Sequence, residues 1–476
     1  MDQLRPDMKT RHQIRSVVIL AALTAFAPLG LAQTFSAEEL AQRAVERRAI
    51  EAANWGMPIV SVDAMRQGFF QNGGKYGDIL YFSKPANWKF QITTPNASSL
   101  YVYLNYDVKE GPWVLEFPGA FGAGLFGSIN DAWQVPIVEV GPAGDDAGKG
   151  GKYLIIPPGF KGKVPVGYLP VRSATYSGYA IFRAIPFTQS DEDIARAIGL
   201  IKKLRFYPLA QAKRPPEQRH IDISGKLFDG IAHFDDSFYD SLARMVNDEP
   251  LQSRDLAMMG LLRSLGIEKG KEFKPDQVTR GVFMKAIEEA HAQFMEANTH
   301  LSPYWPGAKW GISTTVGPKT QFTFQTDNYL DVVERGNFFY LACAPSKKLG
   351  KATFYLGTVH DAVGARLTGG KNYRLHVPPN VPAKQFWAVT VYDLETAGFI
   401  RDSQKIEVNS YQNLQKNADG SVDIYFGSKA PDGKESNWAA IAPGRPWFSF
   451  FRFYGPDQSL FDKTWSLSDI EEVEGR

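Results

Sequence analysis

The sequence predicts a mainly β protein with a helical middle, an α+β fold in which two antiparallel β-sandwich or jelly-roll-like units are joined by helices. Three observations support this fold class. Short runs rich in Tyr, Val, Ile and Phe, separated by Gly and Pro, fill residues 78–186, a pattern typical of antiparallel sandwiches and barrels. Residues 190–300 change to the 3.6-residue hydrophobic period of helices. After residue 303 the short-strand pattern returns.

The length of the chain predicts the number of structural units, and its net charge gives no support to nucleic acid as a partner. At roughly 150 residues per domain, 476 residues suggest about three units. We expect a signal peptide over 1–32, an N-terminal helix plus β-sandwich domain over 33–188, a helical connection over 189–302 and a C-terminal β-sandwich domain over 303–476. The 53 basic and 51 acidic residues give a net charge of +2, which offers no electrostatic basis for binding nucleic acid.

The first 32 residues have the pattern of a secretory signal peptide. Lys9, Arg11 and Arg15 precede an apolar run over 16–29, which is followed by small residues up to Ala32. This run is shorter than the roughly 20 residues that a membrane-spanning helix needs. We therefore expect cleavage after Ala32, a periplasmic or secreted location and no stable membrane span in the mature chain. The alternative is an uncleaved anchor.

Cys343 is the only cysteine, so an intrachain disulfide is excluded. It lies in an apolar, strand-like run over 337–344. Such a cysteine is more often a small buried hydrophobe than a nucleophile. We expect no catalytic role for it.

The N-terminal unit is predicted to begin with a helix. Ser36 and Glu39 form a capping box, the helix continues over 40–53, and the segment 55–58, which contains Pro58, is expected to end it. Short strands are then expected at Leu100–Tyr106, Trp113–Phe117, Gln134–Val140, Tyr153–Ile156 and Tyr179–Ile185.

In the middle of the chain the apolar spacing predicts helices over 190–204, 238–245, 256–265 and 275–298. In the C-terminal unit, alternation predicts a strand with one buried face over 373–377. The runs 386–392 and 448–454 are apolar on both faces and predict central strands.

Several stretches resemble two families that usually occur together. In the first half they are Thr94–Tyr101, Gly111–Pro118, Asn130–Gln134 and Gly150–Gly159, which resemble domain of unknown function 1254. In the second half they are Tyr373–Pro378, Gln385–Asp393, Asn417–Val422, Lys434–Trp438 and Phe451–Pro456, which resemble domain of unknown function 1214.

The resemblance extends from about residue 50 to 475. It implies two jelly-roll-like units joined by helices in an exported homo-oligomer, and it implies no particular activity. The family commonly places Asp and Thr where this chain has Ser98 and Ser99. Any chemistry that depends on that Asp in relatives is therefore in doubt here.

The densest group of polar side chains lies in the first half. Its members are Asn96, Ser98, Ser99, Tyr101, Asn130, Asp131 and Trp133. At the rim of a sandwich such a group suits a small ligand, so Asn96, Ser98, Tyr101, Asn130 and Trp133 are candidates for substrate binding. Asp131 is a candidate catalytic carboxylate, because burial beside Trp133 would raise its pKa. The alternative is that Asn96 and Asp131 serve turns beside prolines.

A second group contains Tyr392, Asp393 and Arg401, with Arg452 in the same family pattern. Tyr392 and Arg401 are candidates for substrate binding, since Arg401 can hold a carboxylate or phosphate with two hydrogen bonds. Asp393 is the second candidate catalytic carboxylate. The structural alternative is that Arg401 only pairs with Asp393.

Cofactor chemistry has little support. His300, His360 and His376 show no close metal-ligand spacing, so we expect no metal. The glycine-rich stretch 119–127 lacks the Lys-Ser/Thr ending of a P-loop, and we expect a flexible loop there. The sequence also has no Gly-x-Ser-x-Gly elbow. No cofactor is therefore predicted.

Two classes of function remain. The first is a hydrolase or lyase that acts on a small or glycan-like substrate in an interdomain or sandwich-rim cleft. The alternative is a non-catalytic periplasmic protein that binds a small-molecule or glycan ligand or assists assembly, because the 10 Trp and 20 Tyr can stack on sugar or aryl faces. We favour the enzyme, since helices between two β units create an enclosed cleft.

Overall fold

The computed structural model describes residues 35–474, apart from 120–123, 187, 189, 348–349 and 351–352. The predicted signal peptide, with its cleavage site, lies outside these residues, as does part of the glycine-rich stretch. The chain divides at Arg43, and residues 44–476 form one unit. Within the described part of the chain, we find no helix with the length and apolar character that crossing a membrane requires.

Helix α1 (Ala37–Gln71) begins at the predicted capping box. The backbone N–H of Ser36 donates to Glu39 at 2.7 Å, and that of Glu39 donates to the Ser36 hydroxyl at 3.1 Å. The predicted end near Pro58 is wrong, because the helix runs on for another 13 residues. A proline inside a helix costs roughly 3 kcal/mol, but most residues from Ala49 to Phe69 are buried, and their burial offsets this cost.

The N-terminal β unit is built from two sheets packed over an apolar core. The six-stranded sheet has the order β11 (His220–Asp222), β1 (Ile79–Tyr81), β3 (Leu100–Asp107), β9 (Ser177–Ile185), β5 (Gly124–Asp131) and β6 (Pro136–Val140). The four-stranded sheet has the order β10 (Arg205–Pro208), β4 (Trp113–Phe117), β7 (Gly151–Ile156) and β8 (Leu169–Arg172). A short pair joins β2 (Phe90–Gln91) to β12 (Phe228–Asp229).

The C-terminal β unit repeats this arrangement. Its six-stranded sheet has the order β13 (Ser302–Pro303), β14 (Gly311–Ile312), β15 (Thr353–Thr358), β21 (Trp447–Pro456), β17 (Ala383–Asp393) and β18 (Glu407–Asn409). Its four-stranded sheet has the order β20 (Trp438–Ala440), β19 (Val422–Gly427), β16 (Asn372–Val377) and β22 (Ile470–Val473). Most strand pairs in both units are antiparallel, so the predicted α+β class with antiparallel β units is confirmed.

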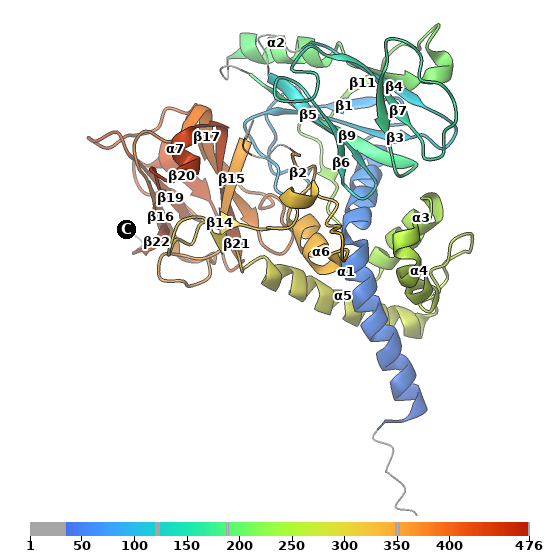
Figure 1. The fold of residues 1–476 in the computed structure, drawn as a ribbon. Helices are drawn as coiled ribbons and strands as arrows, with labels where there is room; N and C mark the ends of the chain where they lie inside the picture. Colours follow the sequence, from blue (N-terminus) through green and yellow to red (C-terminus); the bar gives the residue numbers. More distant parts are fainter. Residues whose placement is uncertain are drawn as a thin grey trace, which may run out of the picture. The chain divides into compact units, whose positions relative to one another are not determined.

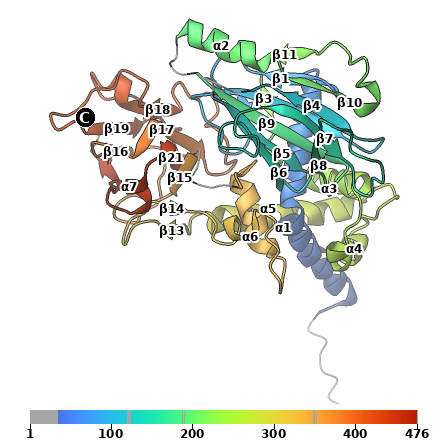
Figure 2. The ribbon, with the colours of Figure 1, turned by 45° about the horizontal axis from the view of Figure 1, so that its top comes forward.

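The helices of the middle are α2 (Asp191–Ile201), α3 (Ser237–Asp248), α4 (Leu256–Arg263) and α5 (Gln277–Ala297), with short 3-10 turns at Leu209–Gln211 and Ser253–Asp255. This middle is not entirely helical, since β10, β11 and β12 join N-terminal sheets. The last short helical elements are Pro318–Thr320, Glu435–Asn437 and α7 (Gln458–Phe461). Figures 1 and 2 both show the two β units side by side, with α5 and α6 (Val332–Leu341) near their boundary.

Helix α6 (Val332–Leu341) replaces much of the strand-like run expected around Cys343. Asp331 caps the helix by accepting from the backbone N–H of Glu334 at 2.9 Å. Gly336 lets it approach α1 closely, because a Cβ there would lie 2.7 Å from the Asn54 carbonyl oxygen. Helical packing on α1 thus overrides the strand preference of the aromatic run.

Candidate functional site

A cavity of about 220 Å³ lies between the two six-stranded sheets. Strands β3 and β9 line it from the N-terminal sheet, and β15 and β21 from the C-terminal sheet. Helix α6 and the segment after it, 342–346, complete the wall. Most lining residues are apolar, among them Ile92, Ile181, Ile312, Phe322, Phe338 and Phe450.

Each sheet contributes one tyrosine and one arginine that lie directly opposite each other on neighbouring strands. On the N-terminal sheet, Tyr101 of β3 pairs with Arg183 of β9. On the C-terminal sheet, Tyr355 of β15 pairs with Arg452 of β21. Arg183 donates from Nη1 to the phenol oxygen of Tyr355 at 3.0 Å. The two pairs therefore meet at the cavity, which Tyr101, Arg183 and Tyr355 line.

The guanidinium groups control the ionisation of Tyr355. Burial alone would raise the pKa of its phenol, but the positive charges of Arg183 and Arg452 outweigh burial and lower this pKa to about 8. For Tyr101 burial dominates and raises the pKa to about 12. Near pH 8 the cavity thus contains one readily ionised phenol and one neutral phenol.

Arg452 connects the C-terminal sheet to the wall of the cavity. Its Nη2 donates to the Thr94 carbonyl at 2.7 Å, and its Nη1 donates to the Tyr392 hydroxyl. Tyr392 in turn donates to the Pro95 carbonyl. The Arg452 guanidinium lies 4.8 Å from the centre of the Tyr355 ring, so its charge stabilises negative charge on that phenol.

Cys343 also lines the cavity. Its thiol donates to the Thr93 carbonyl at 3.7 Å. Burial raises its pKa, which disfavours the thiolate that nucleophilic chemistry needs.

Of the first predicted group, Tyr101 reaches the cavity, whereas Asn96 and Ser98 hold the loop before β3. The Asn96 side-chain oxygen accepts from the backbone N–H of Ser98 at 3.2 Å and of Ser99 at 3.1 Å, and from the Ser99 hydroxyl at 2.7 Å. The Ser98 hydroxyl donates to Glu407 at 2.6 Å. Asn96 thus has the geometry of the turn-forming alternative.

Asn130, Asp131 and Trp133 lie at the end of β5, outside the lining of the cavity. Asn130 accepts from the Ser128 hydroxyl at 3.1 Å. One Asp131 oxygen accepts from the backbone N–H groups of Trp133 at 2.8 Å and Val135 at 3.0 Å. Burial outweighs these bonds and raises the pKa of Asp131 to about 6. The Trp133 ring packs edge-on against Trp55 and beneath the Arg335 guanidinium.

Asp393 and Arg401 do not pair, which corrects the structural alternative for Arg401. Asp393 accepts instead from Nε of Arg445 at 2.7 Å and from the backbone N–H of Glu395 at 2.9 Å. Arg401 bonds to Asp229 at 3.1 Å. Neither residue lines the cavity. Tyr392 also lies outside the lining, where it contacts the Arg452 guanidinium, the Pro95 carbonyl and the ring of Phe450.

Sequence reasoning missed Arg183, Tyr355 and Glu407. Glu407 is buried and accepts from the backbone N–H of Ala97, the Ser98 and Thr390 hydroxyls and the Asn409 amide. The available signal was a lone arginine inside an apolar strand, which describes Arg183 in β9 and Arg452 in β21. Buried arginines need partners, but the sequence does not name them.

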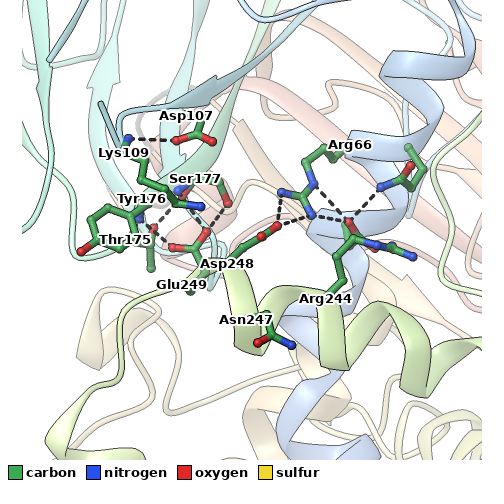
Figure 3. Close-up of polar contacts among 12 residues, drawn as sticks. Arg66, Asp107, Lys109, Thr175, Tyr176, Ser177, Arg244, Asn247, Asp248 and Glu249 are labelled. Atoms are coloured by element: carbon green, nitrogen blue, oxygen red, sulfur yellow. Dashed lines mark hydrogen bonds and ion pairs between the residues drawn. The ribbon is translucent and has the colours of Figure 1, made fainter. Parts of the chain in front are cut away.

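A second polar cluster joins α1, α3 and β9 (Figure 3). Arg66 bonds to Asp63 and Asp248, while Arg244 also bonds to Asp63. Glu249 accepts from the backbone N–H groups of Tyr176 at 2.6 Å and Ser177 at 3.0 Å. Because the protein itself supplies these partners, the cluster ties elements together and is a weaker candidate for ligand binding.

The described residues contain no group of three or more His, Cys, Asp or Glu side chains arranged to hold a metal ion. The polar groups in the mostly apolar lining of the cavity include phenols, hydroxyls and one guanidinium. Such groups bind oxygen atoms of organic molecules by hydrogen bonds.

Comparisons with known proteins place the two tyrosine–arginine pairs of the cavity in two different family matches. Residues 78–208 match the family model described as Protein of unknown function (DUF1254), and residues 352–458 match the one described as Protein of unknown function (DUF1214). Tyr101 and Arg183 lie in the first match, and Tyr355 and Arg452 in the second. A search of curated proteins gave no match.

Two solved structures are similar to the chain. The VPA0106 protein from Vibrio parahaemolyticus shares 17% identity, with a TM-score of 0.54 over 90% of this chain and 100% of that chain. An uncharacterised protein from Burkholderia cenocepacia shares 13% identity, with a TM-score of 0.40 over 91% of this chain and 94% of that chain. The first similarity shows a shared fold.

Proposed function

Since the chain belongs to the family that joins DUF1254 to DUF1214, a family of unknown function, we propose its function from its site. The protein binds a small, largely apolar organic acid in the cavity between its two β units. The observation that carries this proposal is the position of Arg183 on the wall of an otherwise mostly apolar cavity.

The size and lining of the cavity support a compact ligand. An engineered protein cavity of about 150 Å³ accepts benzene, so about 220 Å³ accommodates one ring with a short substituent. The aromatic and aliphatic side chains favour an apolar body over a glycan, which would need many hydrogen-bond partners for its hydroxyls. A single-ring acid fits these requirements.

The charge of the site supports an acidic group on that ligand. Among the described lining residues, Arg183 is the one charged side chain, and no described carboxylate lines the cavity. A guanidinium carries five N–H donors, so Arg183 can hold Tyr355 and a ligand carboxylate together. The Tyr101 hydroxyl, which accepts from the Asn96 N–H at 2.9 Å, has a proton to donate to the same ligand.

Ligand binding is therefore favoured over a hydrolase or lyase that uses Asp131 and Asp393 as acid and base. Both carboxylates lie outside the cavity and are occupied by backbone or arginine partners. An enzymatic role for the cavity requires a different acid–base group.

Export and self-association belong to the same proposal. The basic, apolar and small residues before Gln33 support a signal peptide and a periplasmic or secreted protein. The family resemblance supports a homo-oligomer. Mass spectrometry of periplasmic protein tests the first, with an N-terminus at Gln33 expected and an intact Met1 form contradicting it.

Calorimetric titration with phenylacetate and with its neutral analogue phenylacetamide tests the binding proposal. We expect the acid to bind more tightly than the amide at pH 7. Replacing Arg183 by Gln should weaken phenylacetate binding by about tenfold to a hundredfold, the value of a charged hydrogen bond. The matched control is Arg366→Gln, an exposed arginine paired with Glu296. Equal affinity in Arg183→Gln and the control would refute the proposal.

A further inference from the structure

Tyr355, which is half-buried, differs in its surroundings from the fully buried tyrosines Tyr239 and Tyr392. Its phenol oxygen accepts from Arg183 at 3.0 Å, and the Arg452 guanidinium lies 4.8 Å from its ring centre. Burial raises the pKa of Tyr392 and that of Tyr239 above the usual value of a tyrosine, whereas the two arginines lower the pKa of Tyr355 to about 8. The phenolate of Tyr355 is thus accessible at moderate pH.

Charged and titratable groups face Tyr355 from each neighbouring strand. Strand β9 contributes Arg183, β3 contributes Tyr101, and β21 contributes Arg452 and Tyr454, whose ring centre lies 6.3 Å from that of Tyr355. The nearby carboxylate Glu407 interacts with Arg452, and it already accepts four hydrogen bonds. Positive charge therefore dominates around the phenol.

A proton-transfer group needs contact with its substrate, and Tyr355 has this contact because it lines the cavity beside Arg183. We propose that Tyr355 is an acid–base catalytic residue that moves a proton on a ligand held by Arg183. The substrate class is a small 2-oxo acid with a C–H bond next to its carbonyl group. This inference rests on the proposed ligand-binding function of the cavity.

The step balances without an additional reactant. The Tyr355 phenolate accepts the proton from the carbon next to the carbonyl, so an O–H bond forms and the C–H bond breaks. The electron pair of that bond forms the C=C bond of an enolate, and the carbonyl oxygen takes the negative charge beside Arg183. The phenol then returns a proton to carbon or to this oxygen, which regenerates the phenolate and gives the keto or the enol form.

The first measurement needs no ligand. Ultraviolet difference titration should show one tyrosinate forming near pH 8 in the wild-type protein, and this transition should vanish in Tyr355→Phe. The matched control is Tyr329→Phe, which removes an exposed phenol and should leave the transition in place. A wild-type protein with no tyrosinate below pH 9 would overturn the inference.

The second measurement follows proton exchange directly. In D₂O, the wild-type protein should accelerate loss of the methylene proton signal of phenylpyruvate, with a rate that rises with pH through about 8. Tyr355→Phe should lower this acceleration at least about 100-fold, the usual value of a general base, while its affinity for phenylpyruvate stays close to that of wild type. Tyr329→Phe should retain the full rate.

The outcomes separate this inference from the binding proposal. Wild-type protein that binds phenylpyruvate but exchanges its protons only at the uncatalysed rate would overturn the catalytic role and leave the binding proposal intact. Exchange that persists in Tyr355→Phe would also overturn the catalytic role. Failure of both phenylacetate and phenylpyruvate to bind would overturn both proposals.

Discussion

Arg183 donates a hydrogen bond to the phenol oxygen of Tyr355, 3.0 Å away, although 172 positions separate the two residues in the chain. One residue belongs to the DUF1254 match and the other to the DUF1214 match. Each has a partner of the other type directly opposite on the neighbouring strand, Tyr101 for Arg183 and Arg452 for Tyr355. The cavity thus needs both regions, which gives a physical reason for their occurrence in one chain.

Glu407 should be essential for joining the two regions. Its carboxylate accepts from the Ala97 N–H at 3.1 Å, the Ser98 hydroxyl at 2.6 Å, the Thr390 hydroxyl at 2.8 Å and the Asn409 amide at 3.1 Å. In Glu407→Gln, an NH₂ group replaces one carboxylate oxygen. This new donor then faces the N–H or O–H groups from which that oxygen accepted hydrogen bonds. We expect urea unfolding to show a loss of about 2–4 kcal/mol in the free energy of unfolding. The exposed variant Glu472→Gln is the control, and equal stability of the two variants would contradict this role.

Asp131 should make stability depend on pH in a defined direction. Its folded pKa of about 6 lies above its ordinary value of 3.8, so the folded state binds a proton more tightly than the unfolded state. The contribution of Asp131 to the free energy of unfolding is therefore greatest below pH 4 and falls as the pH rises to about 6. Asn in its place can still accept from Trp133 and Val135, but it does not titrate.

Urea unfolding at pH values from 4 to 7 tests this direction. The free energy of unfolding of wild type, minus that of Asp131→Asn, should fall by roughly 2–3 kcal/mol over this range. Parallel pH profiles for the two proteins would show that Asp131 has an ordinary pKa and would contradict its burial.

Filling the cavity should abolish binding while preserving the fold. Ile312 lines the cavity and is partly exposed, so Ile312→Trp adds volume at the wall with little strain. We expect phenylacetate affinity to fall at least about tenfold, which corresponds to 1.4 kcal/mol. Val363→Trp, at a position 89% exposed, is the matched control. Unchanged affinity in Ile312→Trp, with an unchanged melting temperature, would place the ligand elsewhere.

Local patterns in the sequence predicted the local structure well. The capping box at Ser36 and the strands around Tyr103 and Val389 follow from hydrogen-bonding groups and apolar residues within one segment. The predicted end of α1 at Pro58 was wrong, and much of the strand-like run before Cys343 is helical, for the opposite reason. Packing of α6 against α1 stabilises both helices, and such packing depends on residues far apart in the chain.

The candidate site was harder to predict than the fold. Asn96 and Asp131 were chosen for their chemical groups, but short-range backbone partners already occupy much of their hydrogen-bonding capacity. Arg183 and Tyr355 belong to no sequence motif that would mark them as site residues. Their proximity depends on the register of two sheets and on the way the sheets meet. A sequence without aligned relatives carries no signal for that long-range pairing.

A crystal structure of the protein with 4-bromophenylacetate, whose bromine can be located by anomalous scattering, tests the proposed binding site most directly. We expect a bromine peak between the two six-stranded sheets, near Phe338 and Phe450, and a carboxylate within hydrogen-bonding distance of Arg183. A bromine peak only outside this cavity, or a carboxylate bound away from Arg183, would contradict the central claim.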